Sequence, residues 1–222
     1  TSYFLSLWGG SIRFNTPMLF ALAFLPMFGI GGLTGLPLGL AASDIYLHDT
    51  YYVIGHFHYV VAPGTIFALF AGIYYWFPKM TGKKMNEMLG KLHFWPSLVF
   101  MNGIFMPMFI QGLAGVSRRL ADGGVSYAHA SGVLEWNEFM SMSAFFLGLA
   151  QIPFIINIVM SLFAGEKASR NPWDSTTIEW SAPSPPVGHG NFDKPVNVYH
   201  SAYEYSVPDS KKDFTPQFEK NG

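Results

Sequence analysis

The sequence contains no cysteine and few charged residues. Without thiolates the chain cannot form disulfides, thiolate zinc sites or cysteine-ligated iron–sulfur clusters. Charged residues make up 12% of the 222 residues, whereas soluble domains average about 25%. The formal net charge of −1 offers no basic surface for nucleic acid. What the chain has in quantity is apolar side chains, at 50% of all residues.

Charges are absent altogether from four long windows of the sequence. Each window exceeds the roughly 20 apolar residues that a helix needs to cross a bilayer. We therefore predict an all-α membrane protein, and residues 1–8 have the composition of the end of a further membrane helix. The four predicted transmembrane helices lie near residues 16–37, 51–78, 92–113 and 139–163.

This pattern divides the chain into a membrane region, residues 1–165, and a polar tail, residues 166–222. The tail contains seven prolines, a composition that favours extended segments lying on a partner surface over a folded domain. Lysine and arginine favour the cytoplasmic side, which predicts that the loops 9–13 and 79–91 share that side with the tail. The loops around Asp49 and Arg118 then lie on the outer side.

Two histidines, His56 and His58, flank Phe57 inside the second window. Histidine is rare within membrane helices and commonly marks a site. Residues i and i+2 of a helix point about 200° apart, which separates the ring nitrogens by more than about 10 Å. The two rings are thus too far apart to share one metal ion. They suit two separate ligands, such as two haems on opposite faces, or hydrogen bonds across neighbouring helices.

Polar residues gather at the outer end of the same helix. His48 and Asp49 are adjacent nitrogen and oxygen donors, a pair that suits a hard cation such as Mg²⁺. Arg118 and Arg119 lie in the next outer loop, where their positive charge runs against the topological bias. Because guanidinium groups pair with carboxylates, we interpret the arginines as ligands for an anion such as a haem propionate.

Several segments together resemble subunit I of the haem–copper oxidases. The stretch from His48 to Val60, which reads HDTYYVIGHFHYV, is the most specific of them. The resemblance covers essentially the whole chain and implies the C-terminal portion of that subunit, which is a bundle of twelve helices. The tail is similar to that of the bacterial cytochrome c oxidase type. The other segments are residues 31–35, 73–78, 91–94, 112–119, 177–180 and 183–186.

The resemblance implies a role for each candidate residue. His56 would be the axial ligand of the high-spin haem, where oxygen is reduced, and His58 an axial ligand of the low-spin haem. Phe57 would lie between them on the electron path. His48 and Asp49 would bind Mg²⁺ with a carboxylate from subunit II. The residues expected around the haem propionates are Asp44, His48, Tyr51, Arg118 and Arg119.

The resemblance also implies what this sequence does not supply. The family's copper ligands and the second ligand of the low-spin haem lie upstream of the matched segments. We therefore expect the chain, which has no initiator methionine, to be one piece of subunit I and inactive alone. The implied cofactors are two haem A groups and a shared Mg²⁺. The implied partners are the N-terminal portion of subunit I, subunits II and III, cytochrome c and the lipid bilayer.

The implied activity is reduction of O2 to water with electrons from cytochrome c, coupled to proton pumping. The expected location is the bacterial inner membrane, with the mitochondrial inner membrane as an alternative. A quinol oxidase of the same superfamily is the alternative function, because subunit II largely chooses the electron donor. A membrane haem-binding or transport protein without redox turnover and a non-catalytic assembly fragment are further alternatives.

Overall fold

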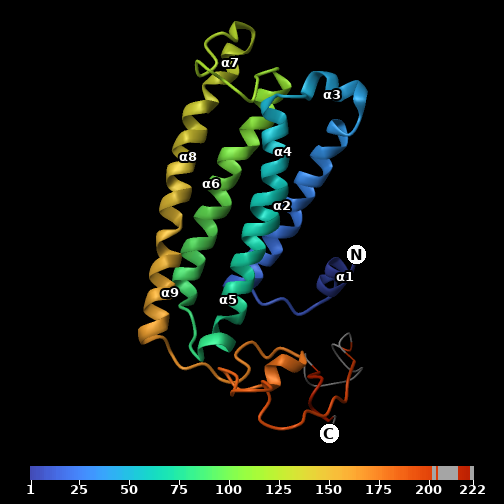
Figure 1. The fold of residues 1–222 in the computed structure, drawn as a ribbon, viewed down its shortest axis with the longest axis vertical. Coiled ribbons are helices and arrows are strands. Elements are labelled where there is room, and N and C mark those ends of the chain that lie inside the picture. Colours follow the sequence, from blue (N-terminus) through green and yellow to red (C-terminus); the bar gives the residue numbers. More distant parts are fainter. Residues whose placement is uncertain (202–203, 205–214, 221–222) are drawn as a thin grey trace. The chain divides into compact units, whose positions relative to one another are not determined.

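The computed structural model describes residues 1–201, 204 and 215–220, and these form helices without a named strand (Figure 1). The chain divides into two compact units, which are described separately. One unit is a helical bundle made of Asn15–Gly72 and Glu87–Ile156. The other contains Thr1–Phe14, Ile73–Asn86 and Asn157–Gly222.

The bundle places α4 (Tyr51–Val61) against both α2 (Thr16–Leu38) and α6 (Glu87–Leu113), and α6 also packs on α8 (Trp136–Ala150) (Figure 1). A short helix, α3 (Ala41–Leu47), follows α2. The core of the bundle is aromatic, and the fully buried ring of Phe20 meets Phe94 edge to face at 4.9 Å. The helix α4 therefore has protein on two of its sides.

Four segments are long and apolar enough to cross a membrane, as the uncharged windows predict. The chain is therefore an all-helical protein with multiple candidate membrane spans over its described residues. The bounds differ from the predicted ones by a few residues at most ends. The four spans are Thr16–Leu38, Tyr51–Thr81, Glu87–Leu113 and Ala128–Ala164.

The second span is continuous but contains a π-helical turn. After α4 the chain forms η1 (Ala62–Phe67) and then α5 (Ala68–Thr81). Pro63 lies near the start of this turn, and its lack of an N–H prevents a regular helical hydrogen bond at that position. A π turn accommodates such a disruption without ending the helix.

The fourth span differs most from the prediction of a single helix at 139–163. It consists of η2 (Ala128–Ala130), α7 (Ser131–Leu134), α8 and α9 (Ile152–Ala164). The boundary between α8 and α9 falls at Gln151, whose φ of −79° and ψ of −19° are still helical. Pro153, the second residue of α9, cannot donate a backbone hydrogen bond into the preceding turn, which explains the boundary.

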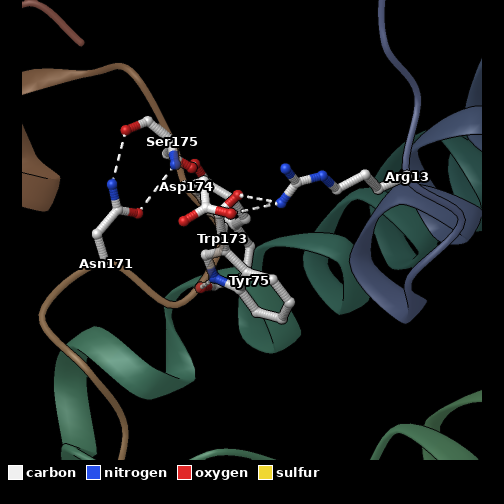
Figure 2. Close-up of polar contacts among 6 residues, drawn as sticks. All are labelled: Arg13, Tyr75, Asn171, Trp173, Asp174 and Ser175. Atoms are coloured by element: carbon white, nitrogen blue, oxygen red, sulfur yellow. Dashed lines mark hydrogen bonds and ion pairs between the residues drawn. The ribbon is translucent and has the colours of Figure 1, made fainter. Parts of the chain in front are cut away.

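In the other unit the three segments predicted to share the cytoplasmic side do lie together. Lys83 pairs with Lys167 in an antiparallel bridge. Arg13, which follows α1 (Ser2–Leu7), forms an ion pair of 2.8 Å with Asp174 (Figure 2). The start of the tail therefore contacts both the 9–13 loop and the 79–91 segment within this unit.

The tail packs on the chain itself, at the end of α5. The indole N–H of Trp173 donates to the carbonyl of Tyr75, and its ring stacks on the ring of Tyr75 (Figure 2). The indole N–H of Trp180, in the short helix η3 (Ile178–Ser181), donates to the Tyr75 hydroxyl at 2.9 Å. The tail therefore packs on a surface of this chain, at Tyr75. The division into a membrane region, residues 1–165, and a tail, residues 166–222, stays a prediction.

Lys79 was predicted to lie in a loop, and the structure corrects that assignment. It belongs to α5, where its side chain is buried. Its ammonium group donates to the carbonyl oxygens of Arg170 at 3.1 Å and Ala182 at 2.7 Å. It also lies 4.9 Å from the ring centre of Trp180. Because carbonyl oxygens of the tail bind the Lys79 ammonium group, the helix α5 can continue through this charged residue.

Candidate functional site

The two histidines at the centre of the prediction lie on α4, which begins at Tyr51 because Thr50 caps it with its side chain. Nδ1 of His56 lies 2.8 Å from the carbonyl oxygen of Gly31, and Nδ1 of His58 lies 2.9 Å from that of Ile54. A carbonyl oxygen only accepts hydrogen bonds, so Nδ1 carries the proton in both rings. Nε2 of each ring is therefore the basic nitrogen.

The rings point toward different neighbouring helices, as the i, i+2 spacing predicts. His56 contacts α2 through Gly31 and through the Thr34 hydroxyl, 3.3 Å from Nδ1. His58 stacks on Phe105 of α6, with ring centres 4.3 Å apart and planes inclined by 14°. One helix thus presents two imidazoles that do not face each other.

Space for the His56 ring depends on Gly35 of α2. A Cβ atom on Gly35 would lie 2.8 Å from Cε1 of His56, closer than such carbons approach each other. Phe57, between the two histidines, is 40% exposed and inclines against His58 at 4.3 Å. The Phe57 ring therefore lies at the surface of the bundle. The two neighbouring imidazoles contact α2 and α6 inside the bundle.

The geometry fits ligation of two metal centres. Across the described part of the chain, Nε2 of His56 and of His58 has no hydrogen-bond partner. Metal-binding histidines characteristically donate their other ring N–H to a carbonyl or carboxylate, which fixes the tautomer and the ring orientation. Gly31 and Ile54 accept these hydrogen bonds here, so Nε2 of both rings is left available as a metal ligand.

The loops that carry Asp49 and Arg118 meet beside the start of α4. Thr50 and Ser117 form an antiparallel bridge, and the amide of Arg118 donates to the carbonyl of Asp49 at 2.9 Å. Asp49 has a φ angle of 58°, a left-handed conformation that aspartate tolerates better than most residues. The two loops therefore lie at the same end of the bundle, and their position on the outer side stays a prediction.

Side chains at this junction form a small charged group. Arg118 Nη2 contacts one carboxylate oxygen of Asp49 at 2.6 Å, and His48 Nε2 lies 3.4 Å from the other. Arg118 Nε is buried and has no acceptor among the described residues. An orphaned guanidinium N–H is costly, so an additional anionic acceptor, such as a carboxylate, suits this position.

Not every predicted site residue joins this group through its side chain. Over the described ranges, Asp44, Tyr51 and Arg119 contribute backbone contacts only. The Asp44 carbonyl accepts from His48 at 2.8 Å, the Tyr51 amide donates to Val116 at 3.0 Å, and the Arg119 amide donates to the Ser117 hydroxyl at 3.4 Å. The exposed Arg119 side chain is therefore available to a ligand or partner.

The described residues contain no group of three or more histidine, aspartate or glutamate side chains placed to hold a metal ion. His48 and Asp49 supply two donors, and Arg118 already occupies one Asp49 oxygen. A cation here would require further ligands from water or another chain. The Mg²⁺ site therefore stays a prediction.

Sequence reasoning missed Phe105 and the carbonyl of Ile54. Phe105 is remote from the histidines in sequence, and nothing in its local pattern indicates that it stacks on His58. The role of Ile54 had a signal, because a carbonyl four residues before a helical histidine is within reach of Nδ1. Gly31, Thr34 and Gly35 were identified only as part of a motif, without their contacts.

Comparisons with known proteins agree on one family. Residues 1–170 match the family model of "Cytochrome C and Quinol oxidase polypeptide I". Cytochrome c oxidase subunit 1 of Synechocystis sp. is 46% identical over 202 residues, which cover 91% of this chain and 35% of that protein. The alternative cytochrome c oxidase subunit 1 of Bradyrhizobium diazoefficiens is 44% identical over 217 residues, 97% of this chain and 37% of that protein.

A solved structure shares the fold. A chain of a haem–copper terminal oxidase dimer matches with a TM-score of 0.58 and 20% identity, over 69% of this chain and 28% of that one. The chain thus spans little more than a third of the length of the curated relatives described above. The family-model match over most of the chain, together with the membrane helices, shows that this chain belongs to the subunit I family of the haem–copper oxidases.

Proposed function

We propose that the chain is part of the catalytic subunit of a cytochrome c oxidase. That enzyme reduces O2 to water with electrons from cytochrome c and couples the reaction to proton pumping. The observation that carries the proposal is the pair of imidazoles on α4, each with Nδ1 bound to a carbonyl and Nε2 free. The family supports oxidoreductase chemistry within a complex.

The proposal assigns His56 to the high-spin haem and His58 to the low-spin haem as axial ligands, with Phe57 between the two. The two haems, of the A type, would supply electron transfer and the site of oxygen reduction. This chain's residues orient the ligands. Gly31 holds His56, Gly35 leaves room for its ring, and Phe105 fixes the plane of His58.

The outer loops would hold the acidic edges of the haems. Arg118 and Arg119 would bind propionates, with Asp44, His48 and Tyr51 nearby. The buried Nε of Arg118 supports this assignment, because it is a charged donor without an acceptor among the described residues. His48 and Asp49 would bind Mg²⁺ together with a carboxylate from subunit II.

The remaining parts of the enzyme would come from other polypeptide segments. We propose that the N-terminal portion of subunit I supplies the copper ligands and the second ligand of the low-spin haem. Subunits II and III complete the complex, and cytochrome c delivers electrons. The bacterial relatives favour the inner membrane of a bacterium as the location, and a mitochondrial inner membrane is the alternative.

A quinol oxidase is the second candidate, because the matching family model includes both donor types. The curated relatives reported above are cytochrome c oxidases, which favours cytochrome c. The subunit composition of the purified complex and its activity with each donor distinguish the two. A subunit II carrying copper and turnover with reduced cytochrome c support the first candidate; turnover with quinol alone supports the second.

Optical spectra of the complete oxidase test the ligand assignments. We expect His58→Ala to remove the low-spin haem signal and His56→Ala to abolish binding of carbon monoxide to the high-spin haem. His189→Ala is the matched control, since His189 is an exposed tail residue. The assignments are wrong if either α4 variant retains the signal that its histidine is expected to produce.

A further inference from the structure

A buried polar contact joins α4 to α6 beside the histidines. The Tyr59 hydroxyl donates to Oδ1 of Asn102 at 2.7 Å. The Tyr59 residue is completely buried, at 0% exposure. Within a membrane no water replaces a lost hydrogen bond at such a position, so this contact favours one rotational setting of the two helices over others.

Both the oxygen and the nitrogen of the Asn102 side-chain amide have polar partners. Its Nδ2 group donates to the carbonyl of Leu98 at 2.8 Å and contacts the Met27 sulfur at 3.4 Å. These contacts fix the orientation of the amide, and Oδ1 is thereby directed to Tyr59. Three helices, α2, α4 and α6, meet through this one side chain.

The contact that orients His58 lies next to this hydrogen bond, again between α4 and α6. Tyr59 follows His58 directly, and Phe105 lies three residues after Asn102 on α6. Side chains three residues apart on a helix are neighbours. Phe105 stacks on His58 with its plane inclined by only 14°. Any rotation of α4 against α6 that breaks the Tyr59–Asn102 bond also changes this stacking.

Close packing between the backbones of α2 and α4 limits the movement of α4. A Cβ atom on Gly31 of α2 would lie 2.8 Å from the Tyr59 carbonyl carbon, so the two helices touch at this level. Phe109 packs against the Tyr59 ring with centres 5.6 Å apart. Tyr59 is thus confined between α2 and α6, and its hydroxyl contact selects the rotation that these packing surfaces allow.

We infer that Tyr59 and Asn102 are positioning residues for His58. Their hydrogen bond sets the rotation of α4 against α6 and, through Phe105, the plane of the His58 imidazole. The inference rests on the proposed function, in which His58 is an axial ligand of the low-spin haem. It assigns no chemistry to Tyr59 itself, whose hydroxyl is turned toward α6 and used there.

Electron paramagnetic resonance of the oxidised, assembled oxidase tests the inference, because the g values of a low-spin haem depend on the planes of its axial rings. We expect Tyr59→Phe to broaden or shift the low-spin signal while carbon monoxide binding at the other haem stays unchanged. Tyr52→Phe is the matched control. Tyr52 lies on the same helix against Phe109, and its hydroxyl has no partner among the described residues.

The double variant Tyr59→Phe/Asn102→Leu separates positioning from simple stabilisation. Replacing both partners removes the unpaired amide oxygen, so assembly is expected to recover even if the single variant assembles poorly. A positioning role predicts that the altered signal persists in the double variant. A wild-type signal in the double variant, or in an assembled Tyr59→Phe oxidase, overturns the inference.

Failure of the proposed function gives a different result. If the wild-type complex shows no low-spin haem signal, or if His58→Ala retains it, the ligand assignment is wrong and the inference falls with it. If His58→Ala loses the signal and Tyr59→Phe leaves it at the wild-type position and width, only the inference is wrong.

Discussion

Replacing Gly35 with alanine perturbs the His56 ring mainly at Cε1, between its two nitrogens. The added Cβ would lie 2.8 Å from Cε1 of His56, 3.4 Å from Nε2 and 3.5 Å from Nδ1. Carbon atoms in contact prefer about 3.5 Å or more, so the ring would have to retreat by roughly 0.7 Å. The ring is tethered by the 2.8 Å contact of Nδ1 with the Gly31 carbonyl, so retreat strains that bond.

The cost follows from the general behaviour of overpacked interiors. Forcing an extra methyl group into a packed site costs about 1–3 kcal/mol. If that strain opposes ligation by His56, retention of its haem weakens by roughly fivefold to 150-fold, since about 1.4 kcal/mol corresponds to a factor of ten. His58 contacts α6 and not Gly35, so we expect the haem bound by His58 to be retained.

Carbon monoxide difference spectra of the assembled oxidase measure this effect. We expect Gly35→Ala to lower the ratio of carbon-monoxide-reactive haem to low-spin haem. Gly32→Ala is the matched control, because a Cβ atom on Gly32 meets nothing within 4 Å. The reasoning is refuted if the two alanine variants have the same ratio, because then the close contact with His56 has no influence on ligation.

Two further predictions concern the loops and the tail. Lys79→Met should increase proteolysis of the tail, because it leaves the Ala182 carbonyl without its donor, at about 1–3 kcal/mol, and removes one of the two donors to the Arg170 carbonyl, which keeps the Ser184 hydroxyl. Lys84→Met, which loses no such bond, is the control, and equal cleavage of both contradicts the prediction. Hydrogen bonds from the Ser126 hydroxyl, first, and from the Gly124 amide lower the pKa of Asp122 below its ordinary 3.8. A lowered folded-state pKa stabilises the turn above the unfolded pKa and loses that effect as pH falls through the folded value. The protection of the Gly124 amide, measured as its exchange rate relative to the intrinsic rate at the same pH, should therefore fall in acid, and Asp122→Asn should abolish that pH dependence; protection that is insensitive to acid in the parent chain would speak against it.

The membrane spans were predictable because the bilayer imposes a simple rule. A segment that crosses it must be about 20 residues long and nearly free of charge, and this rule located all four. Its errors lie where a charge has a partner. Glu87 was placed outside the third helix, yet it begins α6, where its carboxylate accepts the Thr16 amide at 2.7 Å. Lys79 extends α5 because tail carbonyls bind it.

The fourth span shows a different limit of sequence reasoning. Its composition correctly indicates a membrane segment, but composition does not locate the boundary at Gln151. Pro153 lies beside that boundary, and a proline permits either a bend or a boundary in a helix. The side chain of Gln151 donates to the Ser97 hydroxyl at 3.2 Å and lies 3.0 Å from Nε2 of His93. Those partners, remote in sequence, fix the Gln151 side chain at that boundary.

Helical periodicity by itself determined that His56 and His58 point apart, because the 100° advance per residue is a local property of the backbone. The free nitrogen of His58 is also set locally, by the Ile54 carbonyl four residues earlier on the same helix. The tertiary structure decided which nitrogen of His56 is free, by placing Gly31 of α2 at Nδ1, and it set the plane of His58 through Phe105 of α6. Such contacts join residues far apart in the chain, so their geometry depends on how whole helices pack and not on any local pattern.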